Sequence, residues 1–281
     1  MSLFKKVAII GPGLIGGSIG LALKRKRIAL KVIGISRRQK TITLAKKLKA
    51  IDSGSRDIRI VKDADLIILA TPVHTILRLA DILKKIARED AIIMDVGSSK
   101  EEIVARFQKL FCRYIGAHPL AGSEQQGVAS ASPCMFKNSL CVLSVNRKTD
   151  PSALRKITGL WRLLGARTVL LSPASHDKIM AMVSHLPHSV SFALMGTVPQ
   201  GYLKYAAGGL RGTTRIAGSD SILWTDIFLS NRKNILKAIS AFENNLAGIK
   251  KAIQKNNRNL LERKLRQARE RRELLTRVQE L

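Results

Sequence analysis

A glycine-rich turn near the N-terminus constrains the fold of this chain more than any other feature of its sequence. Residues 11–16 have the pattern GxGxxG and directly follow an apolar, β-branched run at residues 6–10. Apolar residues at helical spacing then continue as far as Leu23. A strand, a glycine turn and a helix in this order begin a nucleotide-binding unit, in which the backbone can approach a pyrophosphate at the helix N-terminus. A turn whose glycines serve packing alone is the alternative.

The alternation of strand and helix continues through the first 171 residues. Continuous apolar runs predict further strands over 32–35, 66–70, 92–96, 114–117, 140–145 and 168–171. Segments with helical spacing, such as 41–48 and 75–86, lie between them. Strands that are apolar on both faces are typical of a parallel sheet that is covered by helices on both sides. We therefore predict an α/β, doubly wound Rossmann-type domain that binds NAD(P) over residues 1–171.

The second half of the chain changes character near residues 172–173. No convincing strand pattern follows, and we expect long helices over 176–195, 222–248 and 249–278. This pattern predicts an all-α domain over residues 172–281. The last helix has a candidate apolar stripe for packing or dimerisation, formed by Leu260, Leu261, Leu265, Ala268, Leu275 and Val278.

The charge of the chain first suggests an anionic partner. Lys and Arg number 49 against 20 Asp and Glu, which gives a formal net charge of +29, yet 46% of the residues are apolar. That apolar fraction excludes a disordered polyelectrolyte. A nucleic-acid-binding protein is one alternative, and it predicts DNA binding that weakens steeply with salt. Zinc-finger spacing, RNP aromatics and a helix-turn-helix pattern are not found, so we expect a solvated basic surface and no nucleic-acid partner.

The cysteine and histidine patterns argue against a metal site and against secretion. Cys112, Cys134 and Cys141 lack CxxC spacing, and the histidines do not form HExxH. The uncharged run at residues 7–23 imitates a signal peptide, but it is rich in glycine and no small-residue cleavage site follows. Nothing else approaches the roughly 18 apolar residues of a membrane span. We expect a cytoplasmic protein with reduced thiols and neither a metal nor a membrane partner.

The end of the second predicted strand bears on the choice of cofactor. NAD-binding proteins usually place an acidic residue there, which holds the ribose 2′-hydroxyl. This chain has Ser36, Arg37 and Arg38 instead, and their hydroxyl and guanidinium groups suit a 2′-phosphate. The pattern favours NADP⁺ over NAD⁺, although arginines are common throughout this basic chain. The predicted cofactor-binding residues are Gly11, Gly13, Leu14, Ile15, Gly16, Ser36, Arg37, Arg38, Thr71 and Pro72.

Four further segments carry a family resemblance. They are 95–100 (DVGSSK), 116–124 (GAHPLAGSE), 184–188 (SHLPH) and 208–217 (GGLRGTTRIA), with Trp224 nine residues after Arg215. Together with the glycine turn, they resemble the prephenate/arogenate dehydrogenases of tyrosine biosynthesis over about residues 7–243. The resemblance implies a Rossmann domain, a helical dimerisation domain and a homodimer. It also implies oxidative decarboxylation of prephenate to 4-hydroxyphenylpyruvate with reduction of NAD(P)⁺.

Roles for single residues follow from the resemblance and from side-chain chemistry. His118 is expected to accept the hydroxyl proton while hydride passes to the nicotinamide, a task that suits the pKa range of histidine. Ser98 matches a serine that bonds this histidine or the substrate hydroxyl, and Ser98 and Ser99 also fit a capping box that opens a helix. Arg215 is expected to hold the ring carboxylate. The resemblance adds His188, Ser123, Glu124, Ser219 and Trp224 as substrate-binding residues.

Several alternatives stay open at this point. Prephenate and arogenate differ only in a keto and an amino group, so an arogenate or dual cyclohexadienyl dehydrogenase is possible, while His188 favours prephenate. His185 is expected to shape its helix, and His176 is a weaker site candidate. Gly212 stands where family members often have an acidic residue that joins an ion network at the mouth of the pocket. We therefore do not expect Glu124 and Arg215 to gate the pocket in this chain. A β-hydroxyacid-type dehydrogenase is disfavoured, because the SHLPH and TTRIA segments contain no lysine.

Overall fold

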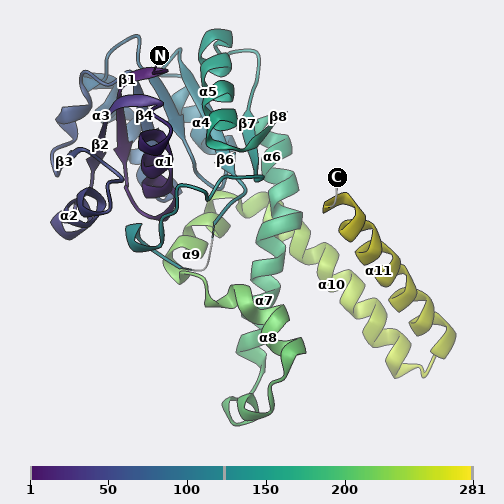
Figure 1. The fold of residues 1–281 in the computed structure, drawn as a ribbon. Helices are drawn as coiled ribbons and strands as arrows, with labels where there is room; N and C mark the ends of the chain where they lie inside the picture. Colours follow the sequence, from purple (N-terminus) through teal and green to yellow (C-terminus); the bar gives the residue numbers. More distant parts are fainter. Residues whose placement is uncertain (1, 123–124, 280–281) are drawn as a thin grey trace. The chain divides into compact units, whose positions relative to one another are not determined.

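The structure is a computed structural model that describes residues 2–122 and 125–279 (Figure 1). Contacts within the chain divide it into two compact units, Met1–Arg232 and Lys233–Leu281, which are described separately.

An eight-stranded sheet forms the centre of the first unit, in the order β3-β2-β1-β4-β5-β6-β7-β8. Neighbouring strands pair in parallel, except that β7 runs antiparallel to β6. The strands are β1 (Phe4–Ile10), β2 (Ala29–Ile35), β3 (Ser53–Ser55), β4 (Leu66–Leu69), β5 (Ile92–Asp95), β6 (Tyr114–Pro119), β7 (Leu140–Ser144) and β8 (Arg167–Leu171). The strand order reverses direction at β1, the place where open sheets of this kind bind ligands.

Helices cover both faces of the sheet, which confirms the predicted Rossmann-type fold. Alternate residues of β1 belong to two separate buried clusters. Val7 and Ile9 pack in the cluster that includes α1, α2 and α5, whereas Ala8 and Ile10 pack in the cluster that includes α3 and α4. The helices of this half are α1 (Leu14–Arg25), α2 (Gln39–Lys47), α3 (Val73–Ile86), α4 (Glu101–Phe107) and α5 (Pro151–Leu164), with short 3-10 turns η1 (Ile58–Val61) and η2 (Val128–Ser130).

The glycine turn is packed too closely for side chains at two of its positions. Gly11 has φ +91°, and a Cβ there would stand 2.5 Å from the carbonyl oxygen of Ala70. A Cβ on Gly16 would stand 2.3 Å from the carbonyl oxygen of Gly11. Gly13 differs, because open space lies where its Cβ would stand. Gly11 and Gly16 therefore bring α1 against the sheet, and Gly13 leaves room above the turn.

The rest of the described chain, after Leu171, is helical. In the first unit the elements are α6 (Pro173–Met180), a π-helical segment η3 (Ala181–His185), α7 (Leu186–Thr197), 3-10 turn η4 (Gln200–Tyr205), α8 (Gly208–Thr214), 3-10 turn η5 (Arg215–Gly218) and α9 (Ser221–Ser230). Helix α10 (Arg232–Gln254) begins at the boundary, and the second unit also contains α11 (Arg258–Gln279), which runs back alongside α10 (Figure 1). The sheet thus ends at Leu171, directly before the predicted helical domain of residues 172–281. The division by contacts falls at Arg232 instead. The domain boundary at residues 171–172 therefore stays a prediction.

Two of the predicted long helices are wrong at their boundaries. The helix expected over 222–248 is broken at Asn231, whose side-chain amide donates a hydrogen bond to the carbonyl oxygen of Asp177 (2.7 Å). The next break was expected at residues 248–249, but it lies at residues 255–257, where Asn256 has φ +47°. Asparagine tolerates this left-handed conformation better than other non-glycine residues, and it ends the helix there.

The π-helical segment has an identifiable cause in the SHLPH sequence. The N–H of Leu186 donates to the carbonyl of Ala181, five residues back. Pro187 has no N–H to donate and its ring clashes with the carbonyl four residues earlier, so a regular α-helix cannot pass this point undisturbed. By length and composition alone, Pro173–Thr197 reaches a mean hydropathy of 1.2, enough for a membrane span, although the core helices of soluble proteins pass the same test. The sequence reasoning had overlooked this stretch.

Candidate active site

Two adjoining cavities lie at the carboxyl ends of the central strands. The first has a volume of about 570 Å³ and runs along the glycine turn and the ends of β2 and β4. Eight of the predicted cofactor residues line it, namely Gly11, Gly13, Leu14, Ile15, Ser36, Arg38, Thr71 and Pro72. Thr41, Gln125 and Gln126 line it as well and were not expected from the sequence. Gly16 and Arg37 do not line it: Gly16 is buried beneath the turn and Arg37 is exposed beside it.

The first cavity fits a dinucleotide. Gly13 leaves space inside the cavity where any other residue would place a Cβ. The hydroxyl of Thr71 is buried and has no hydrogen-bond partner among the residues that the structure describes. A buried hydroxyl without a partner costs free energy, so this group is suited to bonding a ligand. The residues of the turn, Ser36 and Thr71 would hold a nicotinamide dinucleotide here.

The second cavity, of about 500 Å³, brings together residues that are far apart in the sequence. The predicted catalytic and substrate-binding residues that line it are Ser98, His118, His188, Arg215, Ser219 and Trp224. Ser98, Ser219 and Trp224 also line the first cavity, so the two spaces meet at these residues. Two further predicted residues, Ser123 and Glu124, lie outside the described residues. The arrangement places a candidate base, a cation and an aromatic wall around one space beside the cofactor cavity.

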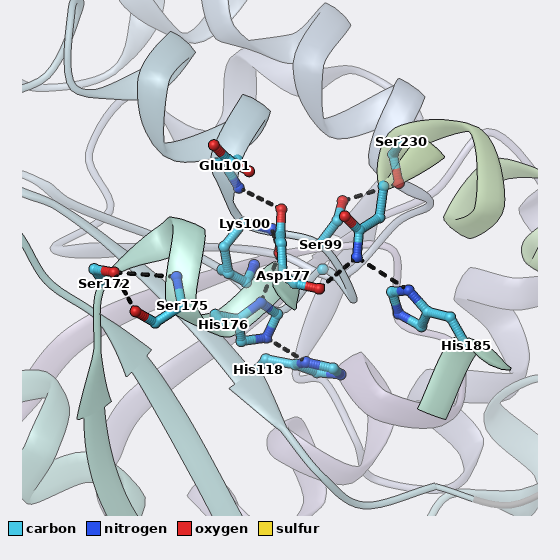
Figure 2. A network of polar contacts seen from close by, with 12 residues as sticks. Ser99, Lys100, Glu101, His118, Ser172, Ser175, His176, Asp177, His185 and Ser230 are labelled. Atoms are coloured by element: carbon cyan, nitrogen blue, oxygen red, sulfur yellow. Dashed lines mark hydrogen bonds and ion pairs between the residues drawn. The ribbon is translucent and has the colours of Figure 1, made fainter. Parts of the chain in front are cut away.

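His118 lies near the end of β6, where it pairs with Val142 of β7. Its ring Nδ1 lies 2.8 Å from Nε2 of His176, and Nδ1 of His176 lies 2.7 Å from a carboxylate oxygen of Asp177 (Figure 2). Burial lowers the pKa of His118 well below its usual range, and the nearby His176, Lys100 and His185 lower it further. His118 is therefore neutral near pH 7 and can accept a proton.

The segment from Asp95 to Lys100 is held from inside the protein. The carboxylate of Asp95 accepts hydrogen bonds from the backbone N–H of Gly97 (2.8 Å), from the hydroxyl of Tyr114 and from the ammonium group of Lys100. The side chains of Asp95 and Lys100 are fully buried. Burial and the charge of Asp95 raise the pKa of Tyr114 well above its usual range. This buried ion pair fixes the loop that presents Ser98 to both cavities.

The predicted capping box at the start of α4 is wrong. No side chain of its own segment caps this helix, and the hydroxyl of Ser99 donates instead to that of Ser230 (2.9 Å). The carboxylate of Asp177 accepts from the backbone N–H groups of Lys100 (2.7 Å) and Glu101 (2.9 Å). Asp177 is more than seventy residues away in the chain, so a local pattern could not show this partner.

His188 and Trp224 form one wall of the second cavity. Their rings stack with centroids 3.5 Å apart and planes 20° apart. Nδ1 of His188 lies 2.9 Å from the carbonyl oxygen of Ser184, to which it donates. The pKa of His188 is lowered by burial, and the charge of Arg215 lowers it too, while the bond to Ser184 opposes the shift. The stacking and the bond from Nδ1 to Ser184 fix the ring, and Nε2 remains as its second hydrogen-bonding atom.

His185 proves to be more than a helix-shaping residue. Its side chain is buried and lines the second cavity, and Nδ1 lies 3.2 Å from the amide nitrogen of Asn231. Burial lowers its pKa to about 4. Its Nε2 has no hydrogen-bond partner in the described parts of the chain. His176 and His185 are thus site residues that the sequence analysis ranked low, and Asp177 is one that it missed. The signal for the two histidines is the concentration of histidines between residues 176 and 188.

A metal site finds no support in the described residues, where no three His, Cys, Asp or Glu side chains gather around one point. Cys112, Cys134 and Cys141 are free.

Fold and site together define the class of the protein, an oxidoreductase that uses a nicotinamide dinucleotide. A family model for the nucleotide-binding domain of prephenate dehydrogenase matches residues 19–170, and one for the dimerization domain of prephenate dehydrogenase matches residues 172–267. The chain belongs to the prephenate dehydrogenase family.

Individual relatives agree with the family models. The chain is 35% identical to the prephenate dehydrogenase of Bacillus subtilis (strain 168), over 82% of this chain and 65% of that protein. It is 36% identical to the prephenate dehydrogenase of Lactococcus lactis subsp. cremoris, over 95% of this chain and 78% of that one. The chain therefore spans about two thirds to three quarters of the length of these curated relatives.

Solved structures match the chain over almost its whole length. The prephenate dehydrogenase of Aquifex aeolicus, in complex with hydroxyphenyl propionate and NAD⁺, is 34% identical with a TM-score of 0.92 and covers 96% of this chain and 98% of its own. A Synechocystis arogenate dehydrogenase is 31% identical with a TM-score of 0.82 and covers 96% and 99%.

Proposed function

We propose that the protein is a prephenate dehydrogenase, which converts prephenate to 4-hydroxyphenylpyruvate and CO₂ with reduction of NAD(P)⁺ in tyrosine biosynthesis. The observation that carries the proposal is the meeting of the two cavities at Ser98 and Trp224, with His118 lining the second. The bound nicotinamide supplies a hydride acceptor for the ring carbon that bears the hydroxyl group. The chain supplies the base, the cation and the walls that orient the ring.

His118 is the proposed catalytic base. Its lowered pKa keeps the ring neutral, so it accepts the proton of the substrate hydroxyl as that carbon becomes a ketone. The ring carboxylate then leaves as CO₂, the electron pair of the broken bond makes the ring aromatic, and the former ketone oxygen takes the proton back from His118 to become the phenol hydroxyl. Ser98 lies at the edge between the cavities, where its hydroxyl can bond the substrate hydroxyl. We assign both residues to catalysis.

Substrate binding falls to residues of the helical half. Arg215 lines the second cavity, and its guanidinium can make two parallel charge-assisted bonds to a carboxylate. We assign it to the ring carboxylate and His188 to the side chain of the substrate. Ser219 and Trp224 line the same cavity. Ser123 and Glu124 are retained as substrate-binding candidates on their sequence positions alone.

Arogenate is the second candidate substrate. The Synechocystis protein, which is 31% identical to this chain, is an arogenate dehydrogenase. Arogenate differs from prephenate by an amino group in place of a keto group. Both substrates present the same ring to His118, so the base does not distinguish them. Steady-state kinetics with each substrate decides the matter, and we expect the larger kcat/KM with prephenate.

We further propose a preference for NADP⁺ over NAD⁺. Ser36, Arg38 and Thr41 line the cavity where the adenosine ribose would lie, and no acidic side chain is among the described residues that line it at the end of β2. Replacing Arg38 with Ala is then expected to raise KM for NADP⁺ by about tenfold while KM for NAD⁺ changes little. Equal effects on both cofactors would contradict the assignment.

The protein is proposed to act as a cytoplasmic homodimer without nucleic-acid or membrane partners. The match to a dimerization domain supports the dimer. Large apolar side chains on the helices after β8 support it too, because Val183, Tyr205, Ile222 and Leu229 are between 63% and 75% exposed. Light scattering after size-exclusion chromatography should give twice the mass of the chain.

The central test is direct. Purified protein should produce reduced nicotinamide absorbance from prephenate or arogenate in the presence of NAD⁺ or NADP⁺. A sample that binds the cofactor but yields no reduced nicotinamide with any of the four combinations would overturn the proposed function.

A further inference from the structure

The ring of His118 is the first member of a chain of polar groups in which the next two, His176 and Asp177, line neither cavity. His118, His176 and Asp177 follow one another at 2.8 Å and 2.7 Å, and His176 and Asp177 are at most 1% exposed (Figure 2). We propose that His176 and Asp177 are positioning residues that place the proton of His118 on Nδ1 and so direct the lone pair of Nε2 toward the substrate cavity. The inference rests on the proposed function only in giving His118 the role of base.

The direction of the chain follows from which groups can donate. An ionised carboxylate only accepts hydrogen bonds, so the proton between Asp177 and His176 belongs to Nδ1 of His176. A neutral imidazole with its proton on Nδ1 has a lone pair on Nε2, and the 2.8 Å contact with His118 then requires His118 to donate from its own Nδ1. Neutral His118 is left with an unprotonated Nε2.

Asp177 is well placed to act as the fixed end of this chain. Its two carboxylate oxygens accept from the backbone N–H groups of Lys100 and Glu101 at 2.7 Å and 2.9 Å. The backbone carbonyl of Asp177 accepts from the amide of Asn231 at 2.7 Å. Each of these three hydrogen bonds has a backbone group as one partner. The side chain of Asp177 therefore cannot rotate without breaking the two hydrogen bonds that cap α4. The position of the carboxylate therefore determines the orientation of the His176 ring.

Burial, more than the surrounding charges, keeps both rings neutral. Lys100 faces both His118 and His176, while Asp177 and Asp95 face His176, and His185 faces His118. Burial outweighs the carboxylates, so the pKa of His176 is lowered as well. A second proton on His176 would turn its Nε2 into a donor and abolish the directed chain. Neutrality of His176 is therefore what keeps Nε2 of His118 available as a base.

The arrangement also limits what Ser98 can do. With Nδ1 of His118 occupied by His176, Ser98 can approach the reaction only from the side of Nε2 or through the substrate hydroxyl. Ser98 thus does not select the tautomer of His118.

The first test reads the tautomers directly, without substrate or cofactor. The chain has five histidines, so two-bond ¹H–¹⁵N correlation spectra with single His substitutions can assign every ring. At pH 7.5 we expect His118 and His176 both to be protonated on Nδ1. His176→Phe should move His118 toward the Nε2–H form, whereas His74→Asn, a change on an exposed side chain, should not. A wild-type His118 found with its proton on Nε2 would overturn the inference even if no variant folds.

The second test separates positioning from packing. His176→Phe fills the site but cannot accept from His118, whereas His176→Gln places an amide oxygen near the former Nε2. We expect kcat to fall by on the order of 100-fold in His176→Phe, as expected for a base in the wrong tautomer, with KM for prephenate within about twofold of the wild type. His176→Gln should recover most of the kcat and return His118 to the Nδ1–H form.

The outcomes distinguish this inference from the proposed function. Unchanged kcat and an unchanged His118 tautomer in His176→Phe would overturn the positioning role. Equal losses in His176→Phe and His176→Gln, with the tautomer intact, would mean that the ring serves packing only and would overturn it as well. Wild-type protein that shows the expected tautomers but turns over neither substrate would instead overturn the proposed function, because the tautomer measurement needs no turnover.

Discussion

Three of the five histidines of the chain line one cavity, a fourth contacts one of these three, and burial lowers the pKa of all four. They are His118, His176, His185 and His188. Imidazole groups held neutral near pH 7 can accept protons and can donate or accept hydrogen bonds without the cost of a buried charge. The neutral histidines thus supply hydrogen-bonding groups to the site without adding positive charge beside Lys100 and Arg215.

The lowered pKa values predict a loss of stability in acid. Folded His185 has a pKa of about 4 against an ordinary 6.5, so between these values the unfolded chain binds more protons than the folded one. The contribution of His185 is complete above pH 6.5 and is lost as the pH falls to about 4, a change of about 3 kcal/mol. Urea unfolding at several pH values should show this slope, and His185→Gln should reduce it. The same slope in that variant would contradict the assignment.

The proposed base gives a second prediction at this scale. His118→Asn removes proton acceptance but keeps a polar side chain of similar reach, so kcat should fall by about 10²–10⁴-fold. Binding of prephenate without a nicotinamide cofactor, followed by calorimetry, should stay within a few-fold of the wild type. A loss of binding with kcat preserved would show that His118 holds the substrate instead.

The buried pair of Lys100 and Asp95 gives a third prediction. Lys100→Met leaves the Asp95 carboxylate without its ammonium partner in a fully buried place. Breaking such a pair costs about 3–5 kcal/mol of the free energy of unfolding. Urea unfolding followed by circular dichroism measures the loss. A change below about 1 kcal/mol would mean that Tyr114 and the N–H of Gly97 suffice to hold Asp95.

Residue by residue, the sequence predicted what local patterns encode. The glycine turn, Ser36 and Arg38 line the cofactor cavity, and His118 and Arg215 line the second one. The pairings between distant residues could not be predicted, because contacts such as that between His118 and His176 depend on how β6 and α6 meet. No local sequence pattern indicates a contact between residues that lie 58 positions apart.

At the level of elements, the π-helical segment η3 places two site histidines. It ends at His185, two residues before Pro187, and His188 follows that proline in α7. Both line the second cavity. The strands were predicted well because apolar β-branched runs mark them, but β3 was missed, since Ser-Gly-Ser at a sheet edge has no apolar pattern. The break at Asn231 was missed because its cause is a bond to Asp177.

Restoring the N–H at residue 187 tests the role of this segment. Pro187→Ala allows regular α-helical bonding, and the return to α-helical spacing would rotate His185 relative to His188. We expect kcat/KM to fall by about tenfold or more, while thermal stability is unchanged or increased. Unaltered kinetics would show that the π-helical segment persists without proline or that the two histidines need no fixed relation.

For the whole molecule, the net charge of +29 has little to do with the proposed chemistry. Among the described residues that line the two cavities, the cationic side chains are Arg38 and Arg215. The other Lys and Arg side chains of the described residues line neither cavity. Composition alone therefore pointed toward a polyanion, whereas motifs in a fixed order pointed to small anionic ligands.

The surface charge still has a measurable consequence. Duplex DNA should bind weakly and without sequence preference, and binding should disappear between about 50 and 200 mM salt, as expected for phosphate contacts alone. Dehydrogenase activity at the higher salt should be unaffected by DNA. Tight binding to one DNA sequence that survives 200 mM salt would contradict our expectation that the protein has no nucleic-acid partner.

The double use of Asp177 matters for recombination between family members. One carboxylate caps α4, which follows the Ser98 loop, and also orients the histidine that meets β6. The segments 95–118 and 172–188 are therefore inherited best as a matched set, although more than fifty residues separate them. A hybrid gene joined at residues 171–172 should fold yet lose turnover when its parents differ at these contacts. Transplanting both segments from one parent should bring the turnover back.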